Sequence, residues 1–169
     1  MTDNGDRKIT IRSATEADVA SVLQFIQELA DYEKLGHEVI ADEARIRDSL
    51  FGENPGAEAC IAFVDDQPAG FALFYENFST FIGRKGIHLE DLFVRPEFRG
   101  LGLGRKLLVK VAAITRSREY QRLTWQVLDW NEPARQFYFG LKATHLAAWQ
   151  SFRVTGDALA SLAAEAERE

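Results

Sequence analysis

Hydrophobic and polar residues alternate along the chain in two distinct periods, which predict its strands and helices. Ile9 and Ile11 alternate with polar residues, which predicts a strand over residues 8–12. Thr15, followed three residues later by Asp18, is typical of a helix start. Apolar residues then recur every three to four positions up to Tyr32, which predicts an amphipathic helix.

The same two periods predict the elements of the remaining chain. Strands are expected over residues 59–64, 69–75, 87–94 and 123–128, with a late pair over 143–148 and 150–154. Helices are expected over residues 42–50, 103–117 and 133–140, and from Asp157 onward. Residues 65–68 (DDQP) predict a hairpin turn, and residues 77–86 a loop rich in aromatic side chains. Hairpins followed by a strand–helix–strand–helix unit predict an α/β (α+β) fold, with a mixed, mostly antiparallel sheet and helices on both faces.

Composition places the chain among ordinary globular domains. With 169 residues, 46% hydrophobic and 27% charged, it is expected to form a single domain over 1–169, with residues 1–7 flexible. No apolar run approaches the ~20 residues of a membrane span, and the polar, acidic start is unlike a secretory signal. The single cysteine, Cys60, lies in an apolar run, so we expect a reduced thiol in the cytoplasm. His37, His88 and His145 lack a metal-ligand spacing, so no metal is expected and all three are interpreted as structural or exposed.

Charge is unevenly distributed along the sequence. The net charge is −6, yet residues 99–122 hold seven basic side chains and one acid, Glu119. An acidic body argues against general nucleic-acid binding, whereas one basic segment suits a small polyanion or is simply a solvated helix face. The acidic remainder favours a cationic substrate.

A glycine-rich turn separates the strand at 87–94 from the helix at 103–117. Gly100, Gly102 and Gly104 let the backbone approach a ligand closely, and the helix that follows directs free N–H groups at it. This arrangement suits a pyrophosphate. Arg105 stands where a dinucleotide fingerprint needs glycine, and the Gly-Lys-Ser/Thr of a Walker loop is missing.

Several stretches together resemble the GNAT acetyltransferases, and within them the diamine (spermidine/spermine and thialysine) N-acetyltransferase group. They keep the order and spacing of that group from about residue 10 to residue 140. They are IRSAT at 11–15, ELADYE at 28–33, LEDLFV at 89–94, the Arg99-x-x-Gly102-x-Gly104 turn, WNEP at 130–133 and FY at 137–138. The resemblance implies a GNAT fold, acetyl-CoA as acetyl donor, a small primary amine as acceptor and a homodimer.

The resemblance also assigns catalytic roles. A lysine-like amine must lose a proton before it attacks, at a cost of about 4–5 kcal/mol at pH 7. Glu90 is the implied base, and Asp91 is a second choice because a bulge on this strand in the family would bring both to one face. Tyr138 is the implied acid that protonates the CoA thiolate. It lies two helical turns beyond Asn131, the expected helix cap.

Two sets of binding residues follow from the resemblance. The residues expected at acetyl-CoA are Leu92, Phe93, Val94, Arg99, Gly100, Leu101, Gly102, Leu103, Gly104, Arg105, Asn131, Pro133, Ala134 and Tyr138. The residues expected at the amine are Tyr32, Glu33, Glu90, Trp125 and Gln126.

The sequence departs from the group after Tyr138. Lys142 stands near a usual glycine, and Trp149-Gln150 replaces acidic residues of the polyamine enzymes. The acceptor is therefore left open between a diamine, a polyamine and a lysine-analogue amino acid. Acetylation of a protein N-terminus or lysine, and a non-catalytic acetyl-CoA-binding module, are the alternatives.

Overall fold

The computed structural model describes residues 7–166, so most of the segment expected to be flexible (1–7) lies outside the described residues. The chain forms two compact units, residues 1–126 and residues 127–169. The elements of the first unit are β1 (Ile9–Ser13), η1 (Glu16–Asp18), α1 (Val19–Tyr32), η2 (Gly36–Glu38), α2 (Glu43–Phe51), β2 (Glu58–Val64), β3 (Gln67–Ser79), β4 (Arg84–Val94), η3 (Pro96–Phe98), α3 (Leu103–Ser117) and β5 (Leu123–Trp125). The second unit holds α4 (Glu132–Gly140) and α5 (Gly156–Ala163).

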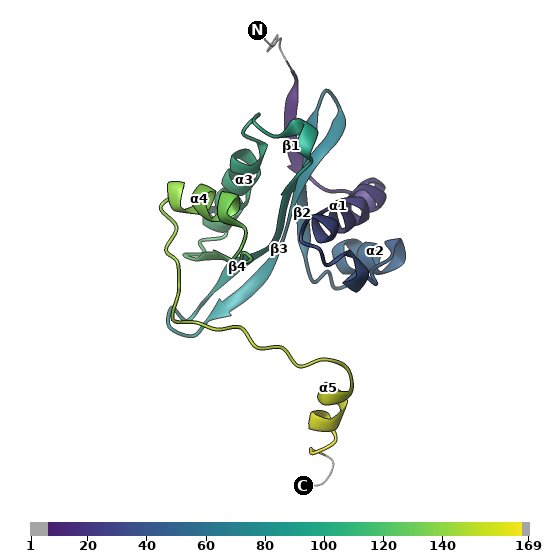
Figure 1. Cartoon of the computed structure of the whole chain (residues 1–169), viewed down its shortest axis with the longest axis vertical. Helices are drawn as coiled ribbons and strands as arrows, with labels where there is room; N and C mark the ends of the chain where they lie inside the picture. Colours follow the sequence, from purple (N-terminus) through teal and green to yellow (C-terminus); the bar gives the residue numbers. More distant parts are fainter. Residues whose placement is uncertain (1–6, 167–169) are drawn as a thin grey trace. The chain divides into compact units, whose positions relative to one another are not determined.

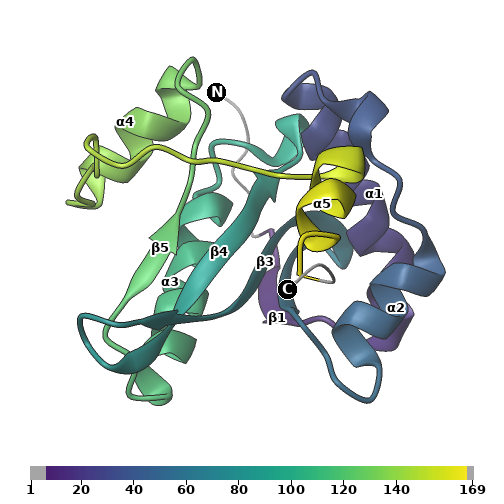
Figure 2. The same ribbon diagram turned by 90° about the horizontal axis from the view of Figure 1, so that it is seen from below.

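The five strands form one mixed sheet in the order β1-β2-β3-β4-β5. The first three pairings are antiparallel and β4 pairs with β5 in parallel. Helices α1 and α2 cover one face and α3 covers the other (Figures 1 and 2). The predicted fold class is therefore confirmed.

The core on the α1 side is aromatic. Phe25 of α1 stacks on Phe71 of β3, with ring centroids 5.2 Å apart, and meets Phe93 of β4 edge-on at 6.4 Å. All three rings are buried. Because residues that pair across strands share a face, these contacts show which side chains of β3 and β4 point toward α1.

The start of α1 is stabilised by a buried carboxylate. Asp18 accepts hydrogen bonds from the Thr15 backbone N–H at 2.7 Å and from the Thr15 hydroxyl at 2.8 Å. Arg12 donates to both oxygens of the same carboxylate, at 2.7 and 2.9 Å. These bonds lower the pKa of Asp18 to about 2, the Arg12 bond being the largest cause. The predicted helix start at Thr15 is confirmed, with a short 3-10 turn before α1.

Three predicted elements differ from the structure. The strand expected over 123–128 ends at Trp125. Residues 77–86 are mostly strand, because the β3–β4 ladder continues to the pair Ser79–Arg84 and only residues 80–83 form the turn. The expected late strands over 143–148 and 150–154 are absent from the described residues, which form turns and irregular backbone there. A strand requires a neighbouring strand edge for its N–H and C=O groups, and alternation alone does not supply one.

Candidate active site

A β-bulge in β4 organises the acidic side chains. Asp91 pairs with Leu73 and Leu89 pairs with Phe74, so Glu90 is an extra residue without a partner on β3. Asp91 lies two residues from Phe93 and therefore points toward α1.

On the other side of the bulge, the pairing of β4 with β3 is shifted by one residue, so different residues of β4 face α1. His88 pairs with Tyr75, which lies two residues beyond Leu73 and shares its face. Glu90 follows His88 by two residues and points the same way. The extra residue thus brings Glu90 and Asp91 to one face, and the bulge expected on this strand is confirmed.

The carboxylates of this face affect one another. Burial, followed by repulsion from Glu90 and from Glu33 at the end of α1, raises the pKa of Asp91 to about 7. Burial also raises the pKa of Glu33. A carboxylate that binds a proton near pH 7 is suited to act as a general base at neutral pH. The resemblance favoured Glu90 as the base and kept Asp91 as a second choice, whereas the burial that raises the pKa of Asp91 has no signal in the sequence.

An imidazole lies beside Glu90. His88 Nε2 is 3.7 Å from Glu90 Oε2, and its ring centroid lies 5.2 Å from that of Tyr75. Burial and the charge of Glu90 raise the pKa of Tyr75. His88 was interpreted as structural or exposed, because the three histidines of the sequence lack a metal-ligand spacing.

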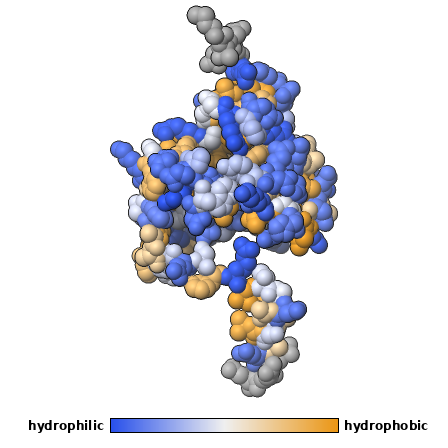
Figure 3. Space-filling view, in the orientation of Figure 1, coloured by the Kyte–Doolittle hydropathy of each residue, from blue (hydrophilic) through white to orange (hydrophobic). Residues whose placement is uncertain are grey.

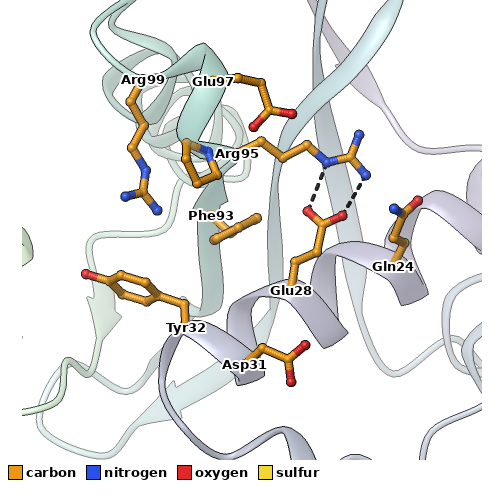
Figure 4. A pocket seen from close by; sticks show the side chains of 9 residues that line it. Gln24, Glu28, Asp31, Tyr32, Phe93, Arg95, Glu97 and Arg99 are labelled. Atoms are coloured by element: carbon orange, nitrogen blue, oxygen red, sulfur yellow. Dashed lines mark hydrogen bonds and ion pairs between the residues drawn. The ribbon is translucent and has the colours of Figure 1, made fainter.

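A groove of about 550 Å³ lies between α1 and the end of β4. Arg95 donates two hydrogen bonds to Glu28, at 2.9 and 3.0 Å, along one wall (Figure 4). The Arg99 guanidinium lies over the Tyr32 ring, 5.3 Å from its centroid. Tyr32, an expected substrate contact, is thus a groove residue. The Glu28–Arg95 pair was missed because it joins positions 67 residues apart.

The glycine turn has the backbone that its sequence predicts. Gly100 and Gly102 adopt left-handed φ angles of 83° and 72°, and Gly102 immediately precedes α3. A Cβ at either position would meet no atom within 4 Å, and one at Gly104 would meet only Val94 Cγ2, at 4.0 Å. Open space above the first turn of a 15-residue helix without acidic residues there fits a pyrophosphate, with the N–H groups of residues 102–105 as donors.

Strand β4, which precedes the glycine turn, pairs with β5 along only part of its length. β5 pairs with β4 only from Ile87–Leu123 to Leu89–Trp125, so Leu92, Phe93 and Val94 lie beyond the last pair. Trp125 pairs with Leu89 and therefore lies on the α3 face, opposite Glu90, while Gln126 follows the end of β5. Their contact with an amine stays a prediction.

Helix α4 of the second unit begins as predicted. The Asn131 side chain accepts a hydrogen bond from the Ala134 N–H at 3.3 Å, and Pro133 lies in the first turn. Tyr138 lies in the same helix, with its ring 5.3 Å from that of Phe137. The predicted cap is confirmed, and the roles of Asn131, Pro133, Ala134 and Tyr138 at acetyl-CoA stay predictions.

Residues 7–166 contain no cluster of three or more histidine, cysteine, aspartate or glutamate side chains able to hold a metal ion. None of the helices described is long and apolar enough to cross a membrane.

Known proteins resemble the chain over most of its length. Residues 23–141 match the acetyltransferase (GNAT) family. A thialysine N-epsilon-acetyltransferase of Sus scrofa is 39% identical over 166 residues, which cover 92% of this chain and 97% of the relative. An L-ornithine N5-acetyltransferase of Arabidopsis thaliana is 27% identical over 197 residues, with 90% and 86% covered.

A solved structure agrees with these sequence matches. An integron cassette protein from the mobile metagenome of V. cholerae superimposes with a TM-score of 0.77 at 26% identity, over 92% of this chain and 97% of that one. The resemblance inferred from the motifs is confirmed. The chain belongs to the GNAT family of acetyltransferases and is an acetyl-CoA-dependent N-acetyltransferase.

Proposed function

We propose that the chain acetylates the primary amine of a small acceptor, either a diamine, a polyamine or a lysine-analogue amino acid. The observation that carries the proposal is the face on which the bulge brings Glu90 and Asp91 together, near Glu33. Several carboxylates beside the aromatic ring of Tyr75 suit an alkylammonium group, through charge pairing and cation–π contact. The relatives named for thialysine and ornithine act on amines of this kind, which supports the proposal.

Glu90 and Asp91 share the work of deprotonation in this proposal. Glu90 is the exposed member and receives the ammonium group, whose proton it accepts directly or through water. Asp91 is the more buried member, and its raised pKa lets it hold that proton near neutral pH. The free amine then attacks.

Acetyl-CoA supplies the thioester acetyl group when it is bound. The backbone N–H groups of the glycine turn, with the Arg105 side chain nearby, hold its pyrophosphate, while backbone groups of Leu92 and Val94 hold the pantetheine arm. Tyr138 donates its hydroxyl proton to the departing sulfur. A phenol is a weaker acid than a thiol by about 2 kcal/mol, so this proton moves as the bond breaks.

The proposal includes a homodimer and a cytoplasmic location, and exposed apolar side chains of the second unit support the homodimer. Several large apolar side chains from residue 146 to residue 162 are exposed, Trp149 by 73% and Phe152 by 91%. Figure 3 shows hydrophobic side chains gathered on α5. A second copy of the chain would remove this surface from water.

A substrate screen tests the proposed function. Purified protein and acetyl-CoA are incubated with spermidine, a short diamine, thialysine, ornithine, lysine and an N-terminal peptide, and thiol release is measured. Turnover of a small amine well above that of the peptide is expected. Turnover of the peptide alone would favour a protein acetyltransferase, and acetyl-CoA binding without turnover a non-catalytic module.

A further inference from the structure

A chain of hydrogen bonds runs across three strands toward Glu90. It begins at Arg122, just before β5, and passes through Asn77 of β3 and Thr124 of β5 to His88 of β4. Arg122 Nη2 lies 3.2 Å from Asn77 Oδ1, Asn77 Nδ2 lies 3.2 Å from Thr124 Oγ1, and Thr124 Oγ1 lies 3.1 Å from His88 Nδ1. Glu90 Oε2 follows, 3.7 Å from His88 Nε2.

The direction of each bond follows from the first residue. Arginine has donors and no acceptor, so Asn77 must turn its carbonyl oxygen toward Arg122 and its NH₂ group toward Thr124. Thr124 Oγ1 thereby accepts from Asn77, and its own proton is available to His88 Nδ1, which is nearer than the alternative acceptor, the Ile87 carbonyl at 3.5 Å. With Nδ1 as the acceptor, the neutral ring would carry its proton on Nε2, which faces Glu90.

We propose that this chain of hydrogen bonds makes His88 a positioning residue. His88 presents an Nε2–H donor to the Glu90 carboxylate and thereby holds that carboxylate on the amine face. The proposal rests on the proposed role of Glu90. The Glu90 side chain is 55% exposed and sits on a bulge, so it is free to occupy many rotamers. His88 is 17% exposed in its side chain, with its ring held between Tyr75 and Thr124. The present 3.7 Å separation is longer than a hydrogen bond, so the proposed contact requires the exposed Glu90 carboxylate to move closer to His88 Nε2.

A change at Asn77 tests the direction of the chain. Asn77→Asp replaces the NH₂ donor by a carboxylate oxygen, so the Thr124 hydroxyl must donate to residue 77 and accept from His88 Nδ1–H instead. The Nε2 lone pair would then face Glu90. Nitrogen-15 NMR of the histidine rings at pH 8 is expected to show the Nε2–H tautomer for His88 in the wild type and the Nδ1–H tautomer in Asn77→Asp. His37→Gln and His145→Gln assign the signals by elimination.

A double-mutant cycle tests the action through Glu90. His88→Phe is expected to lower kcat by roughly 10-fold to 100-fold, since misplacing a reacting group costs on that order. The KM for acetyl-CoA should not change, and His88→Gln, which keeps an N–H donor, should recover most of the loss. In a Glu90→Gln background, His88→Phe should cost less than about twofold more. If His88→Phe fails to fold, Thr124→Val replaces it in the same double-mutant cycle. His37→Gln, at an exposed histidine, is the matched control.

The outcomes separate the inference from the proposed function. An Nδ1–H tautomer in the wild type, or losses that multiply fully in the double variant, would overturn the inference even if amines are acetylated. Wild-type protein that acetylates no amine would overturn the proposed function. The tautomer of the His88 ring would still decide whether the hydrogen bonds from Arg122 to His88 leave an Nε2–H donor facing Glu90. A Glu90→Gln enzyme with full activity would refute the role of Glu90 and with it the catalytic effect of His88.

Discussion

Glu90 and Asp91 are neighbours in sequence whose side chains share one face of the sheet, because Glu90 has no partner on β3. The pKa of Asp91, raised to about 7, reflects burial first and repulsion from Glu90 and Glu33 second. Removing the charge of Glu90 should therefore lower the pKa of Asp91.

Glu90→Gln should lower kcat/KM most at neutral pH. Loss of a general base typically costs ~10²–10⁴-fold, and the deficit should shrink toward pH 9 and above, where free neutral amine becomes plentiful. A pH–rate profile of kcat/KM for the best acceptor provides the measurement. Glu53→Gln, an exposed glutamate outside the groove, is the control and should follow the wild-type profile.

Tyr138→Phe should respond differently to pH. It removes a proton donor from the leaving group, so its deficit should persist at high pH until the wild-type tyrosine itself ionises. Binding of acetyl-CoA should remain, since the ring still packs. If both variants lost the same factor at every pH, the assignment of base and acid would have to be abandoned.

Asp91→Asn should stabilise the fold in a pH-dependent way. The pKa of Asp91 rises from 3.8 to about 7 on folding, so the folded state keeps a proton that the unfolded state has released between these values. This group therefore destabilises the native state increasingly as pH rises through that window. We expect Asp91→Asn to raise the free energy of unfolding by roughly 2–4 kcal/mol at pH 8, with little gain near pH 4.

Urea unfolding of the two proteins at several pH values measures this gain. Asp48→Asn, an exposed aspartate on α2, is the control. A difference between wild type and Asp91→Asn that did not change with pH would contradict the raised pKa.

Gly104→Val should abolish acetyl-CoA binding without harming the fold. The position has no neighbouring atom closer than 4.0 Å to an added Cβ, so the valine occupies only the space above the turn. In the wild type, acetyl-CoA at a hundred times its Kd should add about 2.7 kcal/mol of stability, whereas NAD and ATP should add none. Thermal melts with and without ligand test this. Gly56→Val, also in open space, should keep the shift, and retained affinity in Gly104→Val would refute the site.

The protein should be a dimer in solution. Light scattering at micromolar concentration should give twice the chain mass of 19.0 kDa. Trp149→Ser combined with Phe152→Ser should shift the protein toward the monomer, because these side chains supply exposed apolar surface. Wild-type protein at the mass of one chain would refute the proposal.

Local signals in the sequence were sufficient for most of the fold. Thr15, the hairpin turn predicted at 65–68 and the glycines before α3 each favour a particular backbone, and the structure has those backbones, with the turn itself confined to 65–66. The late strands failed because pairing depends on a partner edge that no local pattern specifies.

The site was predictable only as far as its motifs extend. Glu90, Tyr32 and the glycine turn lie in recognisable stretches, whereas the Glu28–Arg95 pair and the hydrogen bonds from Arg122 to His88 join residues 36 to 67 positions apart. Such contacts arise from strand register and burial. A sequence pattern carries neither.

The bulge has a consequence for how β4 tolerates insertions and deletions. Removing one residue from a regular strand reverses the facing of every residue beyond the cut. Removing Glu90 would instead leave Leu89 opposite Phe74 and Asp91 opposite Leu73, with the buried pattern on both sides unchanged. A chain lacking Glu90 should therefore keep its fold while losing one carboxylate from the amine face, so that at this position a single codon changes the chemistry of the site independently of the architecture.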